Sequence, residues 1–553
     1  MSSTGAELFI EILESYGVTH LFGNPGTTEL PVMDELQQSD IQYILGLHED
    51  VAVGMAAGFA KTRQWHSIED EDVFPLGVVN VHVAPGLAHG LGNVFDSGHL
   101  GSGAPLLITA GLHSTSHQHR EPNLYGNVVE MADQFTKWSA EVKHIDALPS
   151  MVRRAARVAM TPPTGPVFLA LPFDVMIAST TQKPERFGSI PVPGPAKPDL
   201  VSQACEAISK ANEPLMIVGD YLARTGPKAV ESAIELADRC NMHVHGEFRL
   251  SEAAFPTDHP RWKGMLPNDP ELARERLDTD VAVIVGTISN VPTLVQNFPQ
   301  SVFTETSVID IGPDPWELGK NYIADLSISG DIGLVLDAML KELADSTKQR
   351  QPVRSSHSSK EASGNVESDR DGVTNAILAD SICRLTDSVR IIAEATTSVS
   401  ALRTRGSFSP GSFSNYRGGG LGYGLAAAVG IGIAETLRDN RRDVIGFIGD
   451  GALLYYPNAL YTAARYDIDL SIVVPNNRNY KVLKDKLPGL TGRDPSDHEY
   501  IGMELEPPID IPGLAVAQGV PGTVVEHPDD LDGALADAIN VNGPRLVDVR
   551  IVD

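Results

Sequence analysis

The chain has 553 residues, and 72 acidic against 43 basic side chains give it a formal net charge of −29. This length exceeds one compact core, so we expect about two to four domains. The negative charge repels nucleic acid and anionic membranes and excludes partners recognised through a phosphate backbone. Two interpretations of the charge remain: a well-solvated surface, or adaptation to high salt, where screening removes the self-repulsion. The second is favoured, because the charge is large and spread along the whole chain.

The cysteines and the N-terminus indicate the compartment. Cys205, Cys240 and Cys383 lie far apart without paired spacing, which is typical of reduced cysteines in a cytoplasmic protein. The N-terminal run MSSTGAELFIEILESYG has no basic region and no long apolar run, so we expect no signal peptide. We also expect no membrane helix, since no stretch reaches roughly 18 apolar residues.

The first predicted domain covers residues 1–180. Apolar side chains at helical spacing in 4–16 follow Thr4, a candidate N-cap, with Glu7 completing a capping box. Apolar runs that predict strands alternate with predicted helices, one of which, HEDVAVGMAAGFAKTR, is rich in small residues suited to close packing. The predicted strands are 18–23, 41–47, 76–83 and 104–111, and 164–175 closes the unit. This alternation predicts a parallel sheet with helices on both faces.

Two linkers separate two further domains. The Pro-rich stretch 181–199 and the Ser-rich polar stretch 345–371 have the composition of an extended and of a flexible linker, respectively. The middle domain, 195–344, has predicted strands at 214–220, 243–247, 281–286 and 307–312. The C-terminal domain, 372–553, has them at 389–395, 443–451, 469–477 and 544–552. The predicted fold class is therefore α/β, with three doubly wound parallel-sheet domains.

The most informative motif lies in the C-terminal domain. An apolar strand enters Gly449-Asp450-Gly451, an amphipathic helix follows, and a second apolar strand ends at Asn476-Asn477. Because parallel strands end at the same edge of a sheet, we expect Asp450 and Asn477 to converge. Carboxylate and amide oxygens are hard ligands for Mg²⁺ or Ca²⁺. Glycines followed by a helix N-terminus suit an anion, so the motif predicts a metal that bridges a diphosphate to the protein.

This pattern resembles the motif of thiamine-diphosphate (ThDP)-dependent enzymes, and the resemblance covers essentially the whole chain. The segments HLFGNPGTTELPVM, LHEDVAVGMAAGFA and NYRGGGLGYGLAAAVGIGIA are most similar to benzoylformate decarboxylases, in the group that holds pyruvate decarboxylase and acetolactate synthase. The resemblance implies that the N-terminal domain binds the aminopyrimidine and the C-terminal domain the diphosphate. It also implies sites between subunits, hence a homodimer or homotetramer.

The resemblance implies a set of cofactor-binding residues in the C-terminal domain. The Mg²⁺ ligands would be Asp450, the side chain of Asn477 and the backbone carbonyl of Asn479. Residues matching diphosphate contacts are Gly449, Gly451, Ala452, Thr396 and Tyr480. Gly419 and Leu421 match positions beside the aminopyrimidine, where Leu421 would be the bulky wedge that keeps the cofactor bent.

The resemblance also implies catalytic residues in the N-terminal domain. Glu49 matches the glutamate that protonates the pyrimidine ring and so drives removal of the thiazolium C2 proton. Its place between apolar 41–47 and a run of small residues predicts partial burial. His82, at the end of an apolar strand, matches a catalytic histidine that performs acid/base work. Thr27 stands where the pattern has serine.

Three positions depart from the benzoylformate decarboxylase pattern. The pattern's second catalytic histidine is absent, and the nearest match is around Thr293. Arg417 and Lys486 stand where apolar or aromatic residues are expected. If either faces the substrate, we expect a 2-oxo acid with a polar or anionic distal group. Alternatively, each points to solvent or pairs with acids such as Asp485 or Glu29.

The function that the resemblance implies is a ThDP- and Mg²⁺-dependent lyase acting on a 2-oxo acid. The ylide adds to the keto carbon, CO₂ leaves, and the resulting enamine is protonated to an aldehyde. An acetolactate-synthase-like carboligase, in which the enamine attacks a second carbonyl compound, remains an alternative, because the two share every step up to the enamine. An alternative of another class is a non-catalytic ThDP-fold partner protein, against which the intact Glu49, Asp450 and Asn477 argue. The middle domain lacks a basic, glycine-rich signature for FAD.

Overall fold

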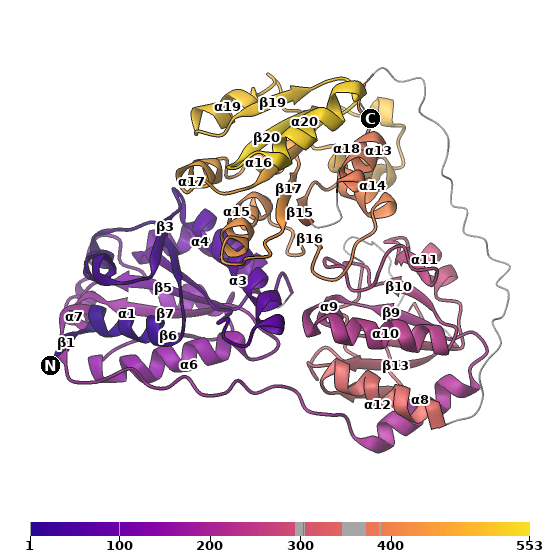
Figure 1. The fold of residues 1–553 in the computed structure, drawn as a ribbon, viewed down its shortest axis with the longest axis horizontal. Coiled ribbons are helices and arrows are strands. Elements are labelled where there is room, and N and C mark those ends of the chain that lie inside the picture. Colours follow the sequence, from indigo (N-terminus) through magenta and orange to yellow (C-terminus); the bar gives the residue numbers. More distant parts are fainter. Residues whose placement is uncertain are drawn as a thin grey trace. The chain divides into compact units, whose positions relative to one another are not determined.

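The computed structural model describes residues 2–98, 100–292, 302–303, 305–345, 372–385 and 389–552. The chain divides into two compact units: residues 1–190, 371–402 and 418–553 form unit 1, and residues 191–370 and 403–417 form unit 2. Each of the three predicted domains contains a parallel sheet with the helices between its strands, as the doubly wound prediction requires (Figure 1). Nearly all of the predicted linker 345–371, and Thr293, lie outside the described residues.

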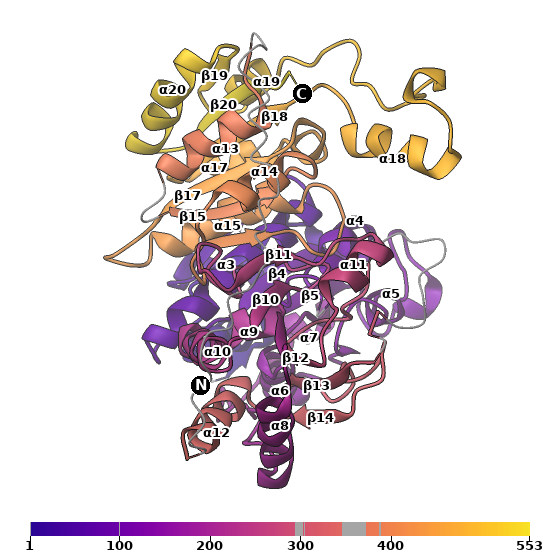
Figure 2. The same ribbon diagram turned by 90° about the vertical axis from the view of Figure 1, so that its right-hand side faces the viewer.

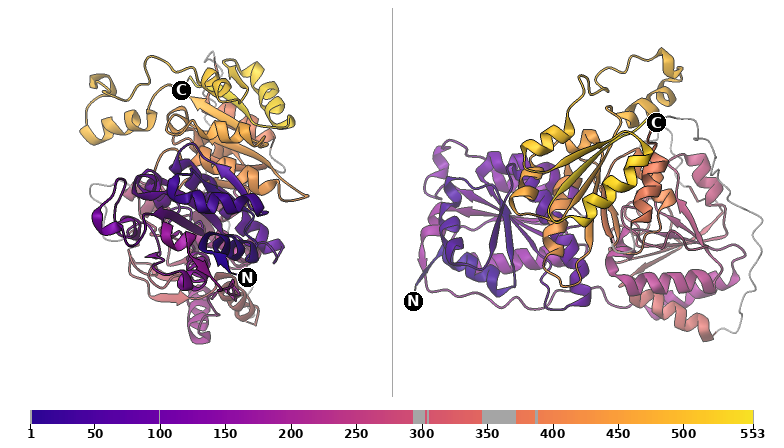
Figure 3. Two further views of the ribbon diagram at one scale, coloured as in Figure 1. Left: turned by 90° about the vertical axis from the view of Figure 1, so that its left-hand side faces the viewer. Right: turned by 45° about the horizontal axis from the view of Figure 1, so that its top comes forward.

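The N-terminal sheet of unit 1 has the strand order β3-β2-β4-β5-β7-β6, and all its pairs are parallel. Its strands are β2 (His20–Gly23), β3 (Gln42–Leu45), β4 (Gly77–His82), β5 (Leu106–Leu112), β6 (Ser139–Glu141) and β7 (Val167–Pro172). Helices lie on both of its faces (Figure 3). They are α1 (Gly5–Ser15), α2 (Leu30–Glu35), α3 (Glu49–Glu69), α4 (Val83–Asp96), α5 (Val128–Asp133), α6 (Leu148–Met160) and α7 (Phe173–Ile177). The chain reverses direction across the sheet between β2 and β4, where doubly wound sheets bind ligands.

Helix α1 begins with the capping box that the sequence predicted. Thr4 caps α1 by accepting from the N–H of Glu7 at 3.1 Å, and the Glu7 carboxylate accepts from the Thr4 N–H at 3.3 Å. The same segment opens with β1 (Ser3–Thr4), which pairs antiparallel with β8 (Ser179–Thr180) and so ties together the two ends of the N-terminal domain.

The C-terminal sheet of unit 1 contains the parallel order β15-β17-β18-β20-β19. Its strands are β15 (Val389–Glu394), β17 (Asp443–Ile448), β18 (Ser471–Asn476), β19 (Gly522–Val525) and β20 (Arg545–Arg550). The helices are α13 (Asn375–Arg384), α14 (Ser398–Arg405), α15 (Tyr423–Glu435), α16 (Asp450–Leu453), α17 (Ala459–Arg465), α18 (Lys481–Thr491), α19 (Ile511–Ala517) and α20 (Pro528–Asn540). Helix α18 stands away from this sheet (Figure 2).

Helices α3 and α15 pack side by side and join the two sheets of unit 1 (Figure 1). Their small residues explain the contact: a Cβ on Gly58 would collide with the backbone of Ala427, and one on Gly430 with the backbone of Met55. The backbones therefore approach more closely than larger side chains permit. This is the packing that the small-residue composition of 48–63 predicted.

Unit 2 contains the third sheet, with the parallel order β11-β10-β9-β12-β13-β14. Its strands are β9 (Leu215–Val218), β10 (His243–Gly246), β11 (Trp262–Met265), β12 (Val281–Val285), β13 (Ser307–Gly312) and β14 (Leu326–Ser329). Its helices are α8 (Pro198–Lys210), α9 (Asp220–Thr225), α10 (Pro227–Arg239), α11 (Pro270–Arg276) and α12 (Ile332–Asp345). Among the helices of the described residues, none is long and apolar enough to cross a membrane.

The segment Arg403–Arg417, which includes β16 (Phe413–Asn415), belongs to unit 2, although the sequence placed it in the C-terminal domain. Its contacts explain the difference, since the hydroxyl of Thr257 donates to the carbonyl of Gly406 at 2.8 Å and the N–H of Asn415 donates to the carbonyl of Ser251 at 2.7 Å. Contacts with partners so far away in the sequence leave no local signal.

Candidate active site

The ends of β17 and β18 meet at the carboxyl edge of the C-terminal sheet. Oδ2 of Asp450 accepts from the backbone N–H of Arg478 at 2.7 Å, and Oδ1 accepts from the N–H of Gly451 at 2.9 Å. Arg478 directly follows Asn477, so the two predicted ligands do converge. Burial raises the pKa of Asp450 to about 6, because its carboxylate loses hydration that a bound cation would replace.

The loop after β18 supplies amide oxygens beside this carboxylate. Oδ1 of Asn477 accepts from the N–H of Asn479 at 3.1 Å, and the Asn479 side chain donates to the carbonyl of Asn477 at 2.7 Å. Within the described residues, Oδ1 of Asn479 is buried without a hydrogen-bond partner. A carboxylate, amide oxygens and a buried oxygen that accepts no hydrogen bond within the described residues form a set of ligands that fits Mg²⁺.

The neighbouring strand ends form the rest of this edge. The N–H of Gly449 donates to the carbonyl of Glu394 at 2.9 Å, which places the ends of β17 and β15 side by side, with Thr396 exposed just beyond β15. A Cβ on Gly451 would lie 2.8 Å from Cε1 of Tyr480, so any larger residue there would displace the Tyr480 ring. Ala452 is buried in the first turn of α16, where backbone N–H groups lie at a helix N-terminus. These groups fit a diphosphate.

The glycine run before α15 is held by a buried glutamate. Gly419 and Gly422 have φ values of +98° and +99°, which glycine adopts without strain. Glu394 accepts from the N–H of Gly422 at 2.7 Å and from that of Gly424 at 2.6 Å. Leu421, directly before the first of these glycines, is half-buried. Burial raises the pKa of Glu394 to about 8 despite the two donors.

A second carboxylate meets the same run from the N-terminal domain. The N–H of Gly420 donates to Oδ1 of Asp96 at 3.3 Å, and a Cβ on Gly418 would collide with the Asp96 side chain. Asp96 is the last residue of α4. The run 418–424 is therefore held between β15 and α4, and these contacts fix the backbone on both sides of Leu421.

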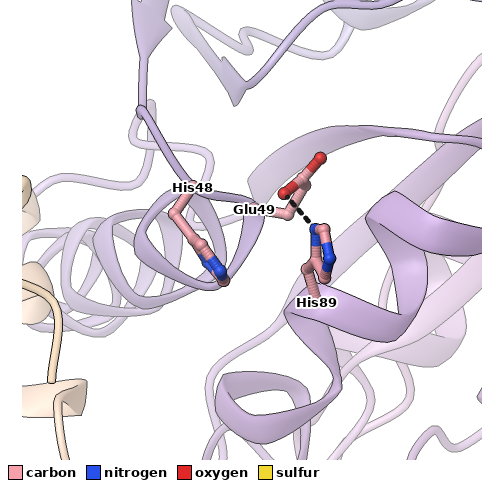
Figure 4. Close-up of side chains that lie close together, drawn as sticks. All are labelled: His48, Glu49 and His89. Atoms are coloured by element: carbon pink, nitrogen blue, oxygen red, sulfur yellow. Dashed lines mark hydrogen bonds and ion pairs between the residues drawn. The ribbon is translucent and has the colours of Figure 1, made fainter.

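Glu49 is the first residue of α3 and is buried, as its sequence context predicted. His48 is the N-cap, and its Nδ1 accepts from the N–H of Asp50 at 3.1 Å. Nδ1 of His89, from α4, lies 3.1 Å from Oε2 of Glu49 (Figure 4). The carboxylate thus has one oxygen engaged by an imidazole.

His82 ends β4 and is oriented by a buried acid that the sequence did not reveal. Its Nδ1 lies 2.7 Å from Oε2 of Glu29 and 3.2 Å from Oγ1 of Thr28. Glu29 is itself fixed, since it accepts from the N–H groups of Gly26 and Gly111 and from the hydroxyl of Thr28. An acceptor at Nδ1 places the ring hydrogen there and leaves Nε2 as the ring nitrogen with a lone pair. Thr27 lies in the same turn with its side chain exposed.

Glu49 and His82 flank the first turn of α4. A Cβ on Gly86 would lie 3.0 Å from Oε1 of Glu49 and 3.4 Å from Cβ of His82. The two residues with predicted proton-transfer roles therefore lie on either side of one glycine.

Family models of thiamine pyrophosphate enzymes match all three sheets: the N-terminal TPP binding domain matches residues 3–136, the central domain 201–339 and the C-terminal TPP binding domain 396–549. The chain belongs to the thiamine pyrophosphate enzyme family. Thiamine pyrophosphate is another name for thiamine diphosphate, so the family confirms the cofactor class that the GDG…NN motif predicted.

Similar proteins within this family include decarboxylases and carboligases. The chain is 30% identical to a benzoylformate decarboxylase of Pseudomonas aeruginosa, over 98% of this chain and 97% of that protein. It is 25% identical to the large subunit of acetolactate synthase isozyme 2 of Escherichia coli, over 99% and 95%. Among solved structures, a 4-hydroxybenzoylformate decarboxylase of Rhodococcus jostii has a TM-score of 0.85 at 27% identity, covering 99% of both chains.

Arg417 of this thiamine pyrophosphate enzyme is buried and paired with acids, which is one of the alternatives that the sequence left open. Its side chain is 3% exposed, and Nη1 lies 2.9 Å from Asp220 and 3.0 Å from Glu247. Nη2 donates to the carbonyl of Ile288 at 2.6 Å. The partners suggested by the sequence, Asp485 and Glu29, are not its partners. Arg417 instead binds the carboxyl ends of β9, β10 and β12 together.

Lys486 lies on α18 with its side chain exposed. On the same helix, Lys481 pairs with Asp485 at 3.1 Å. The acid that the sequence offered as a possible partner for Lys486 is therefore bound to another lysine. Contact between Lys486 and a substrate stays a prediction.

Proposed function

We propose that this thiamine pyrophosphate enzyme is a ThDP- and Mg²⁺-dependent 2-oxo acid decarboxylase that releases an aldehyde. Its similarity to benzoylformate decarboxylase over nearly its whole length supports the proposal. Bound ThDP supplies the carbanion chemistry and electron sink that cleavage next to a keto group requires. The chain's own residues must hold the cofactor, move protons and exclude competing reactions.

The proposed binding roles follow the sheet edges. Asp450, Asn477 and Asn479 hold the metal, as a carboxylate and amide or backbone oxygens that suit a hard cation. Gly449, Gly451, Ala452, Thr396 and Tyr480 face the diphosphate from the ends of β15, β17 and β18. Gly419 and Leu421 support the aminopyrimidine from the run held by Glu394. Glu49 shares a proton with the aminopyrimidine.

The observation that carries the decarboxylase proposal is the His82–Glu29 pair. Nδ1 of His82 lies 2.7 Å from a carboxylate that is itself 1% exposed, so the ring is oriented and Nε2 is left free. An oriented imidazole delivers a proton to a carbanion, and protonation is the step that separates aldehyde release from attack on a second carbonyl compound. Thr27, at the same turn, is proposed to contact the substrate.

The substrate class is proposed to be an aromatic or aliphatic 2-oxo acid. Because Arg417 is paired inside unit 2, the polar-pocket argument now rests on Lys486 alone. The names of the similar proteins suggest benzoylformate and 4-hydroxybenzoylformate as first substrates. Pyruvate is included to test the acetolactate-synthase-like alternative.

A product assay on the holoenzyme tests the proposal. The protein, loaded with ThDP and Mg²⁺, is given benzoylformate, 4-hydroxybenzoylformate and pyruvate, and CO₂, aldehyde and acetolactate are quantified. We expect one aldehyde per CO₂. His82→Ala should lower kcat by roughly 10²-fold or more, since general acid–base catalysis contributes that much. The exposed His527→Ala should match the wild type. Acetolactate as the main product would favour the carboligase, and no turnover of any acid would favour the non-catalytic partner protein.

The assembly and compartment are part of the proposal. We expect a homodimer or homotetramer with sites completed between subunits, as the family resemblance implies, and light scattering of the active fraction measures this directly. A fully active monomer would contradict it. In the described part of the chain, none of the three cysteines is in a disulfide, and Cys205 and Cys240 are buried, which fits a reducing compartment such as the cytoplasm.

A further inference from the structure

Helix α4 carries a set of contacts to the first turn of α3 that the proposed function does not yet use. Nδ1 of His89 lies 3.1 Å from Oε2 of Glu49 (Figure 4). Four residues later, Asn93 donates from its N–H to Oδ1 of Asp50 at 2.7 Å and from its side chain to the Asp50 carbonyl at 2.8 Å. Because residues four apart share one face of a helix, a single face of α4 holds both acids.

Small residues let this face approach α3. A Cβ on Gly90 would lie 3.3 Å from Cγ2 of Val53, and one on Gly86 would lie 3.0 Å from Oε1 of Glu49. The glycines bring α4 close enough for His89 to reach the carboxylate, and they leave Oε1 beside a residue without a side chain. Among the described residues, the hydrogen-bonding partner of Glu49 is at Oε2.

The same three side chains also form a possible cation site, since ligand atoms of His48, Glu49 and His89 all lie within 4.8 Å of one another. Two observations count against a metal there. Nδ1 of His48 already accepts from the N–H of Asp50 as the N-cap of α3, and that helix N-terminus repels a cation. The polarity instead favours the Glu49 side chain as a hydrogen-bond acceptor with His89 as its donor.

Three other titratable side chains lie near this pair: Asp50, His48 and Tyr456. Asp50 lies beside Glu49 on α3, and burial raises its pKa, whereas the nearby His48, His89 and Tyr456 lower it. The His48 ring centroid lies 5.3 Å from that of His89 and 5.1 Å from that of Tyr456. Within the described residues, none of these groups hydrogen-bonds to Glu49, and His89 is its direct partner.

We propose that His89 is a positioning residue that selects the oxygen of Glu49 at which the proton resides. With Nδ1–H donating to Oε2, that oxygen becomes the less basic of the two, so a proton taken up by the carboxylate resides on Oε1, next to Gly86. Oε1 is then the atom that shares its proton with the aminopyrimidine, while His89 orients the carboxylate and transfers no proton. This inference rests on the proposed function, because it requires that Glu49 activates bound ThDP.

The test measures hydrogen–deuterium exchange at C2 of ThDP bound to the holoenzyme with Mg²⁺, alongside ThDP affinity by calorimetry. His89→Ala should slow exchange roughly tenfold or more, the usual cost of losing a group that orients a ligand, with affinity changed less than about threefold. His89→Asn places an amide N–H near the position of Nδ1 and should restore most of the rate. The exposed His527→Ala should match the wild type.

Each other outcome overturns the inference. An unchanged exchange rate in His89→Ala, while Glu49→Gln slows exchange, rejects His89 and leaves the proposed function standing. Unchanged exchange in both variants rejects the proposed function itself. Equal slowing in His89→Ala and His89→Asn, or loss of ThDP binding in His89→Ala, assigns His89 a structural role only.

Discussion

Nη1 of Arg417 lies 2.9 Å from Oδ2 of Asp220, and the two side chains are 3% and 0% exposed. The two residues are 197 apart in the sequence, so the contact ties the segment that precedes Gly418 in the chain to the sheet of unit 2. The guanidinium holds the pKa of the Asp220 carboxyl below its usual range. In turn, Glu247 and Asp220 raise the pKa of Arg417, although burial opposes this.

Removing Arg417 should therefore destabilise the protein and leave substrate preference unchanged. Arg417→Met leaves buried Glu247 without its cation and Asp220 with Arg224 alone, at 3.8 Å, which costs about 3–5 kcal/mol of unfolding free energy. Combining it with Asp220→Asn and Glu247→Gln should recover part of this loss. Arg384→Met, which breaks an exposed pair with Asp532, is the control and should cost less than about 1 kcal/mol. Urea unfolding measures all three. A specific loss of kcat/KM on polar 2-oxo acids, with normal stability, would instead indicate that Arg417 contacts the substrate.

Cofactor binding should depend on Asp450 and on a divalent ion. Asp450→Asn removes the carboxylate that Gly451 and Arg478 orient, so ThDP affinity in Mg²⁺ should fall roughly 100-fold. Wild-type protein in chelator should show a comparable loss. Calorimetry compares these with Asp529→Asn on the exposed start of α20. ThDP affinity that chelator leaves intact would show that no metal bridges the diphosphate.

Stability should fall as pH rises through the neutral range because of Glu394. Burial raises its pKa from 4.5 to about 8, so between these values the folded state holds a proton that the unfolded state has released. Its contribution is complete below pH 4.5 and is lost as pH rises through 8, by at most about 1.4 kcal/mol per pH unit. The free energy of unfolding of the wild type minus that of Glu394→Gln should show this slope. A flat or rising difference would mean that the two glycine N–H groups keep Glu394 ionised.

The net charge of −29 leads us to expect a protein that salt stabilises. Screening at molar KCl removes repulsion between acidic side chains, so the melting temperature should rise as KCl is added. NaCl at equal ionic strength is the matched condition and should act similarly. A melting temperature that stays constant or falls would mean that the charge only solvates the surface.

The sequence predicts best those features that local patterns encode. Strands β4, β17 and β18 are continuous apolar runs because both sheet faces are covered, and each was predicted. Strands β6, β11, β14 and β19 were missed, because they are short, partly polar strands at or next to the sheet edges. The sequence correctly predicted that Asp450 meets the loop that contains Asn477, because the topology brings the ends of β17 and β18 to one edge of the sheet.

Contacts that depend on tertiary packing left no such signal. Glu29 reaches His82 across 53 residues and His89 reaches Glu49 across 40, and neither spacing follows a helix or strand period. The sequence left Arg417 between substrate contact and ion pairing because its neighbours in sequence are the glycines proposed to bind the cofactor, whereas its charge partners come from the ends of β9 and β10. Side-chain direction at such a junction is decided by the fold.

The most direct test of the account is the activation of bound ThDP by Glu49. Glu49→Gln keeps the shape of the side chain and can still hydrogen-bond, but it cannot share a proton with the aminopyrimidine. We predict that the variant binds ThDP and Mg²⁺ as the wild type does, while C2 proton exchange, followed by NMR, and the kcat for 2-oxo acid decarboxylation both fall by roughly 10²-fold or more. Wild-type exchange and turnover in this variant would contradict the account, because another group would then activate the cofactor.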